Sequence, residues 1–152
     1  MAHFEKRSRR WKGWPEGDGG TTVRHGEPMT TMTRDQVLET VREARAAGRR
    51  ADLTGTDLSG ADLTFVDLFG VDLTGANLTN AMVAGANLTI ASLTRANLRG
   101  VFLTHADLTH ADLTHADLPR ANLTVANLTY ATLTHADLRG ADLRGADLTH
   151  AT

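Results

Sequence analysis

Large apolar side chains recur at every fifth position along most of the chain. Residues 51–150 divide without a break into twenty five-residue repeats, and the third position is leucine in nineteen of them. The first position is mostly alanine, the second mostly aspartate or asparagine, and the fourth mostly threonine. We expect the third positions to form the hydrophobic core: Leu53, Leu58, Leu63, Leu68, Leu73, Leu78, Val83, Leu88, Leu93, Leu98, Leu103, Leu108, Leu113, Leu118, Leu123, Leu128, Leu133, Leu138, Leu143 and Leu148.

A period of five fits neither regular helix nor regular strand. On an α-helix, residues five apart would spiral around the axis and leave no continuous apolar face. On a straight strand, residues five apart point to opposite faces. The chain must therefore turn a corner in every repeat so that each leucine returns to one axis. Glycine at the fifth position of eight repeats suits such corners, because glycine tolerates a positive φ.

The tandem pattern A-(D/N)-L-x-x over residues 51–150 resembles the pentapeptide repeat family. The resemblance implies an all-β solenoid, a right-handed quadrilateral β-helix in which four repeats make one square coil. Twenty repeats would then make about five coils, stacked about 4.8 Å apart. Each coil of such a solenoid is stabilised mainly by its neighbours.

A helix is predicted over residues 33–48, directly before the solenoid of residues 49–152. Thr33 and Gln36 have the spacing of a capping box, and Gly48 is a typical helix stop. A short helix running into the first coil also resembles the N-terminal cap of the family. The residues expected to cover the open end of the solenoid, near Leu53 and Leu58, are Val37, Leu38 and Val41.

Residues 1–32 are polar, basic and glycine-containing, which predicts a flexible or weakly ordered tail. Trp11 and Trp14 among basic residues could instead bind nucleic acid by charge and stacking, which we consider the less favoured reading. The tail lacks the apolar core of a signal peptide, and no segment is long enough to span a membrane. We therefore expect a cytoplasmic protein with no membrane association.

The opposite end of the solenoid has no predicted lid. The leucines of the last coil would be exposed there, which predicts a homodimer formed end to end. The alternative is that Thr149, His150 and Thr152 fold over the opening. The candidate dimer coil contains Leu133, Leu138, Leu143 and Leu148.

Acidic residues at the second position have two interpretations. Residues 51–152 carry eleven Asp against five Arg, although the whole chain has a net charge of only −2. Members of the family that protect DNA gyrase present an acidic rod that mimics duplex DNA, so a type II topoisomerase is a candidate partner. Aspartate and asparagine interchange freely here, however, which indicates local hydrogen bonds to turn backbone rather than a need for charge.

Apolar and histidine residues on the outside supply the remaining candidates. Met82 and Phe102 replace Asp at equivalent positions of consecutive coils, which indicates either a partner surface or a local packing pair. His115 and His135 should stack one coil apart, and two imidazoles alone make a weak metal site. A threonine ladder from Thr54 to Thr134 suggests exposed strand positions, with ice binding as a remote alternative. The complete candidate partner surface is Met82, Phe102, Phe65 and Phe69.

The sequence thus predicts a non-catalytic binding or scaffold module. Catalysis needs convergent groups in a concave site, whereas this rod is convex and filled with leucine. The chain contains no cysteine, which excludes thiolate catalysis and cysteine–zinc sites. We expect no cofactor and no metal, a protein partner of unknown identity, and as the alternative a gyrase-directed DNA mimic.

Overall fold

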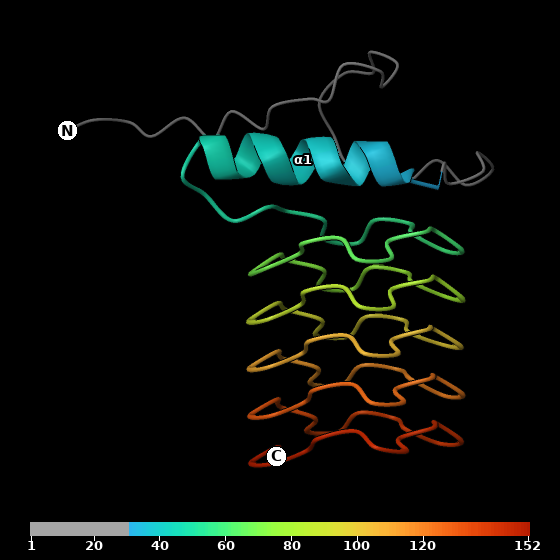
Figure 1. The fold of residues 1–152 in the computed structure, drawn as a ribbon. Helices are drawn as coiled ribbons and strands as arrows, with labels where there is room; N and C mark the ends of the chain where they lie inside the picture. The colour runs from blue at the N-terminus through green and yellow to red at the C-terminus, as the bar shows by residue number, and fades with distance from the viewer. Residues whose placement is uncertain (1–30) are drawn as a thin grey trace.

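The computed structural model describes residues 31–152, which form one helix, α1 (Arg34–Ala46), followed by a stack of coils (Figure 1). The coils are joined by isolated parallel β-bridges between second positions twenty residues apart, such as Asp52 with Asp72 and Asp72 with Ser92. One coil therefore takes four repeats and has four faces, which we number first to fourth by Leu53, Leu58, Leu63 and Leu68. Within the described residues, no helix is long and apolar enough to cross a bilayer.

Every repeat turns its corner in the same way. The carbonyl of the third residue accepts a hydrogen bond from the N–H three residues later, as Leu53 does from Thr56 at 3.2 Å. The fifth residue has a positive φ, whether it is Gly55 (63°) or a residue with a side chain such as Ile90 (52°). A left-handed residue at the third place of a four-residue turn is the feature of a type II turn. Twelve corners therefore hold a non-glycine residue in a conformation that glycine adopts more easily.

Apart from this turn bond, backbone groups of the repeats are satisfied between coils. The third residue donates to the second-position carbonyl of the next coil, as Leu53 does to Asp72 at 2.8 Å. The second residue donates back to the first-position carbonyl of the preceding coil, as Asp72 does to Ala51 at 2.9 Å. The ladder thus runs parallel to the solenoid axis, which leaves the side chains of each repeat to divide between the axis and the solvent.

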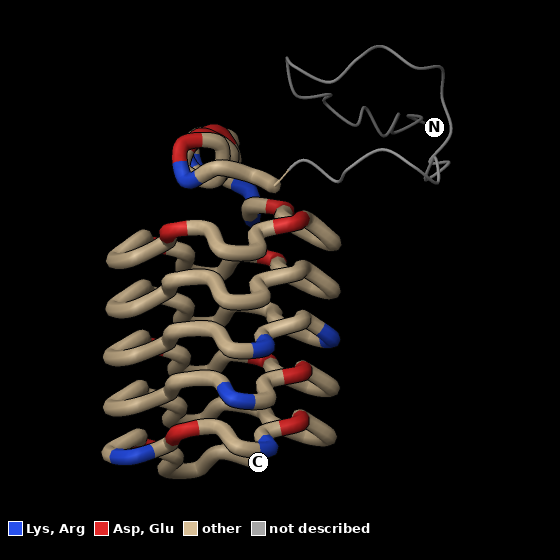
Figure 2. Tube along the Cα trace, turned by 90° about the vertical axis from the view of Figure 1, so that its right-hand side faces the viewer, with Lys and Arg blue, Asp and Glu red and all other residues tan. Residues whose placement is uncertain are grey.

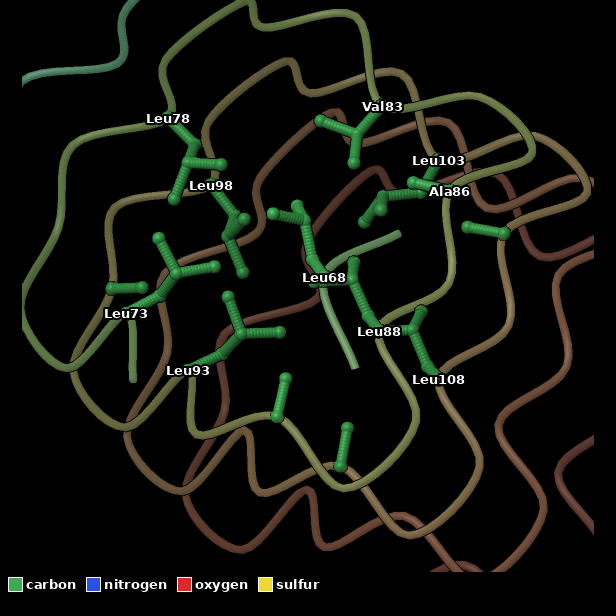
Figure 3. Close-up of a cluster of buried hydrophobic side chains, with 14 of the residues drawn as sticks. Leu68, Leu73, Leu78, Val83, Ala86, Leu88, Leu93, Leu98, Leu103 and Leu108 are labelled. Atoms are coloured by element: carbon green, nitrogen blue, oxygen red, sulfur yellow. The ribbon is translucent and has the colours of Figure 1, made fainter. Parts of the chain in front are cut away.

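The core is a column of leucines on the axis (Figure 3). Every third-position residue from Leu53 to Leu128, Val83 included, is at most 1 % exposed, and the small first-position side chains fill the space between them. This is the core that the period predicted. Burial ends with the last coil, where Leu133, Leu138 and Leu143 are only partly buried and Leu148 is 38 % exposed.

Helix α1 lies across the first coil (Figure 1). Its N-terminus carries the predicted capping box, in which Thr33 and Gln36 exchange hydrogen bonds. Val37 and Val41 are buried in the common core together with Ala44. The expectation for Leu38 was wrong: this side chain is 40 % exposed, because Val37, Val41 and Ala44 follow the i, i+4, i+7 spacing of one helix face and Leu38 lies beside it.

Met32 belongs to the ordered end of the molecule rather than to the tail of residues 1–32. Its N–H donates to the Asp57 carbonyl at 2.7 Å, and its side chain packs against the core. Met32 thus extends the column of backbone hydrogen bonds between coils by one bond beyond the first coil, on the second face. The predicted flexibility and the nucleic-acid hypothesis for Trp11 and Trp14 concern residues outside the described range.

Candidate functional site: the outer faces of the solenoid

Second-position Asp and Asn side chains hold the turns of their own repeats. The Oδ1 atom accepts from the N–H two residues later, as Asp112 does from Thr114 at 2.9 Å and Asn122 from Thr124 at 3.0 Å. Where that residue is threonine, its hydroxyl often donates to the same oxygen, at 2.5 Å for Thr114. Carboxylate and amide oxygens serve equally well, which agrees with the sequence-based interpretation of local turn bonds.

Asp117 is the exception, and Pro119 explains it. Proline has no N–H, so the repeat of Asp117 cannot form the side-chain bond to the residue two positions later. Asp117 lies instead 3.9 Å from Arg99 in an exposed ion pair. This carboxylate is therefore present without the structural role that its equivalents have.

Arginines neutralise part of the acidic surface near the last coil. Arg139 and Arg144 each form a fork on the aspartate two residues earlier, with Nη2–Oδ2 distances of 2.6 Å to Asp137 and Asp142. These hydrogen bonds from the guanidinium groups lower the pKa of both carboxyl groups to about 2. Figure 2 shows acidic and basic positions mixed along the coils rather than an unbroken acidic strip.

Two apolar side chains interrupt the turn bonds on the third face. Met82 and Phe102 are bridge partners in consecutive coils and are 44 % and 48 % exposed. Neither can accept a hydrogen bond from the residue two positions later, so both repeats lose the bond that most repeats have. Phe65, 80 % exposed, projects from the corner of the same face, where its ring occupies the space that a side chain at Gly85 would need. Phe69 lies on the fourth face and belongs to a different environment.

Two columns of aromatic rings run down two corners. His115 and His135 stack as predicted, with centroids 4.9 Å apart and planes 13° from parallel. His110, Tyr130 and His150 form a second stack, at 4.8 and 4.7 Å, which was not predicted although its rings have the same twenty-residue spacing. Nitrogen lone pairs of parallel stacked rings point in parallel directions and do not converge on one ion. Among residues 31–152, no group of three or more His, Asp or Glu side chains has a metal-binding arrangement.

Comparison with known proteins identifies the repeat. The sequence model of the family described as pentapeptide repeats matches residues 49–89, 86–124 and 126–152 with eight copies. The chain is a pentapeptide repeat protein. Its solenoid therefore belongs to the right-handed β-helices of this family, as the sequence predicted. No curated protein matches the chain significantly.

Several solved pentapeptide repeat proteins are similar to it. One from the thylakoid lumen of Arabidopsis thaliana is 37 % identical, covering 66 % of this chain and 67 % of its own, with a TM-score of 0.52. HetL of Nostoc sp. strain PCC 7120, involved in regulating heterocyst differentiation, is 33 % identical over 68 % of this chain and 60 % of its own, with a TM-score of 0.35. The plasmid-mediated fluoroquinolone resistance protein QnrB1 is 20 % identical over 66 % and 59 %, with a TM-score of 0.32.

Threonines on the first face of this pentapeptide repeat protein serve the turns. The Thr74 hydroxyl donates to Asp72 at 2.6 Å, and that of Thr114 donates to Asp112. These two hydroxyl groups therefore stabilise the turns of their own repeats. The structural interpretation of the threonine ladder therefore has support that ice binding lacks.

Residues at the far end continue the ladder instead of covering it. The Thr152 N–H donates to the Ala131 carbonyl at 3.1 Å, and the His150 ring stacks under Tyr130. Thr149 binds the carboxylate of Asp147 in its own turn. None of these three residues folds over the leucines of the last coil, so the described part of the chain presents that coil as an open end.

Proposed function

We propose that this pentapeptide repeat protein is a non-catalytic binding module that contacts a partner protein through the Met82–Phe102 patch, defined as Met82, Phe102 and Phe65. The observation that carries the proposal is the loss of two successive turn bonds in favour of exposed apolar side chains. Each lost bond costs about 0.5–1.5 kcal/mol. A sulfur–aromatic contact between the two side chains would contribute about 0.3–1.5 kcal/mol, which is less than two lost bonds cost at the middle of their range.

The shape and surroundings of the patch define the partner that fits it. The three side chains protrude from a convex face, and they are bordered by Asp62, held near Arg34 at 3.6 Å, and by Asn122. An apolar centre within a polar border is typical of a small hot spot. The complementary surface is an apolar pocket on a folded protein, deep enough to take the Phe102 ring.

Replacing Met82 and Phe102 together by aspartate tests the proposal. Aspartate is the usual residue at these positions and restores the turn bonds, so thermal stability should rise while binding is lost. Asn122→Asp, a polar exchange on the same face, is the matched control. Partners captured from native lysate would be purified and titrated calorimetrically. Equal affinity for wild type, the double variant and the control would refute the proposal, as would the absence of any saturable partner.

A DNA-mimicking binder of DNA gyrase is the second candidate. The observation that favours it is the excess of six acidic residues over residues 51–152. The arginine forks on Asp137 and Asp142 weaken it, because they neutralise carboxylates that a DNA mimic would present. A supercoiling assay with purified gyrase tests it: inhibition, or protection from a fluoroquinolone, would support mimicry, and neither effect would remove it.

We further propose that α1 caps the first coil and that the last coil forms an end-to-end homodimer. The N–H groups of Leu138, Leu143 and Leu148 have no acceptor within residues 31–152, and the carbonyls of the matching first positions have no donor. A rim with both kinds of group can pair with a second copy of itself. In light scattering, Leu143→Lys should give monomers, and Thr134→Lys, on the outside of the same coil, should leave dimers. A monomeric wild type at micromolar concentration would exclude the dimer.

A further inference from the structure

A cleft of about 490 Å³ lies where the end of α1 meets the first two coils. It is separate from the Met82–Phe102 patch, since it opens at the fourth face and its corner. Phe69, Ile90 and Val41 supply the apolar lining, and Arg45, Arg49 and Arg50 supply the polar border. The volume lies in the range of small-molecule sites, and the cleft combines apolar walls with a few charged groups as such sites do, although it is open to solvent on one side.

The apolar wall contains a residue that the fold itself does not favour. Ile90 occupies a corner with φ of 52°, where a β-branched side chain is a genuine outlier. Such a conformation costs on the order of 1–3 kcal/mol. Val125 is a second β-branched corner, so what distinguishes Ile90 is its place in the wall of the cleft. Phe69 also departs from its repeat, because it stands where threonine is usual and is 52 % exposed. Both departures meet in this cleft.

Two of the three arginines are held in place by the solenoid. Arg45 binds the Asp67 carboxylate at 2.9 Å and the Asp67 carbonyl at 3.2 Å. Arg50 donates to the carbonyls of Gly70 and Val71 at 2.5 and 3.0 Å. These contacts fix the position of the connection between α1 and the first coil, and with it the width of the cleft.

Arg49 is the arginine left available for a ligand. Its guanidinium has no hydrogen bond or ion pair with any group of residues 31–152, whereas its N–H closes the helix by donating to the Ala44 carbonyl at 3.0 Å. Gly48 donates to Arg45 at 2.9 Å, so these two bonds form the Schellman pattern and satisfy carbonyls at the helix end. The negative end of the helix is thereby shielded, and the charge facing the cleft is positive.

We propose that this cleft binds a small amphipathic carboxylate, whose aromatic or branched aliphatic group lies on Phe69 and Ile90 and whose carboxylate pairs with Arg49. The apolar wall alone would accept neutral compounds. The unpaired guanidinium at its border selects an anion, because planar guanidinium and carboxylate groups form paired charge-assisted hydrogen bonds.

Calorimetric titration of the full chain with 2-naphthoate tests the assignment. We expect saturable one-to-one binding, no binding of acetate, which lacks the ring, and at least tenfold weaker binding of 2-naphthalenemethanol, which lacks the charge. Arg49→Gln should weaken 2-naphthoate binding by about tenfold, as expected for a charged hydrogen bond. Arg95→Gln, which removes an exposed corner arginine outside the cleft, should have no effect.

Ile90→Asn separates binding from folding. Asparagine tolerates the left-handed conformation, so thermal stability should stay equal or rise while 2-naphthoate affinity falls about tenfold. Val125→Asn makes the same kind of change at a corner outside the cleft and should leave affinity unchanged. The proposal is overturned if 2-naphthoate does not bind at millimolar concentration, or if Arg49→Gln and Ile90→Asn bind it as wild type does.

Discussion

Removing one turn carboxylate should destabilise the solenoid only where that carboxylate has an N–H to bind. Asp112 accepts from the Thr114 N–H at 2.9 Å and from its hydroxyl at 2.5 Å. At about 0.5–1.5 kcal/mol per bond, Asp112→Ala should cost about 1–3 kcal/mol. Asp112→Asn keeps an acceptor oxygen and should cost much less. Thermal unfolding followed by circular dichroism should show a fall of at least about 4 °C for the alanine variant.

Asp117 is the matched control in the next repeat of the same coil. It accepts no such bond because of Pro119, and its ion pair with Arg99 is exposed, so Asp117→Ala should change stability by less than about 1 kcal/mol. In a Pro119→Thr background, the N–H is restored, and the same Asp117→Ala change should become costly. A coupling free energy near zero between the two positions, or equal losses for Asp112→Ala and Asp117→Ala, would refute the turn-bond explanation.

Three further changes test other parts of the fold. Val37→Asp places a charge in a fully buried position and should cost at least about 2 kcal/mol in urea unfolding, whereas Leu38→Asp on the exposed side of α1 should stay within about 0.5 kcal/mol. Val125→Asn relieves a β-branched residue at φ 59° and should raise stability by about 1 kcal/mol. Asp137 and Asp142 have folded-state pKa values of about 2, below the ordinary 3.8, so their contribution is present above pH 3.8 and is lost as the pH falls towards 2; melting at pH 4.5, 3 and 2 should show this loss, and Asp137→Asn should reduce it.

The core was predictable because one spacing determines it. Leucine at the third position of nearly every five-residue repeat leaves the chain no other way to bury its apolar groups, and the fifth-position glycines indicated the corners. The error for Leu38 was to count it with the stripe of Val37, Val41 and Ala44, because only these three follow the i, i+4, i+7 spacing of one helix face. The capping box, by contrast, is a local contact between residues three apart and was visible in the sequence.

The outer sites were less predictable, because they depend on how separate segments meet. The cleft lies where Arg45 and Arg50 attach the end of α1 to the solenoid, and sequence spacing does not encode the angle of that attachment. The stack of His110, Tyr130 and His150 follows from the twenty-residue spacing and could have been found by comparing all rings at each corner. Phe65 and Phe69 are four residues apart, but Phe65 ends a repeat of the third face and Phe69 belongs to the next repeat, on the fourth face.

Most second positions carry a hydrogen-bond acceptor, charged or neutral, that binds the turn of its own repeat, so the positions without one need a separate explanation. Ser92 keeps a polar oxygen, which lies 2.9 Å from the Thr74 hydroxyl. Met82 and Phe102 keep none and expose apolar surface on consecutive coils. Restoring aspartate at both should make the solenoid more stable, since it adds turn bonds and removes exposed apolar area. If the double variant is the more stable protein, the fold does not account for Met82 and Phe102, and the proposed apolar contact with a partner protein would account for them.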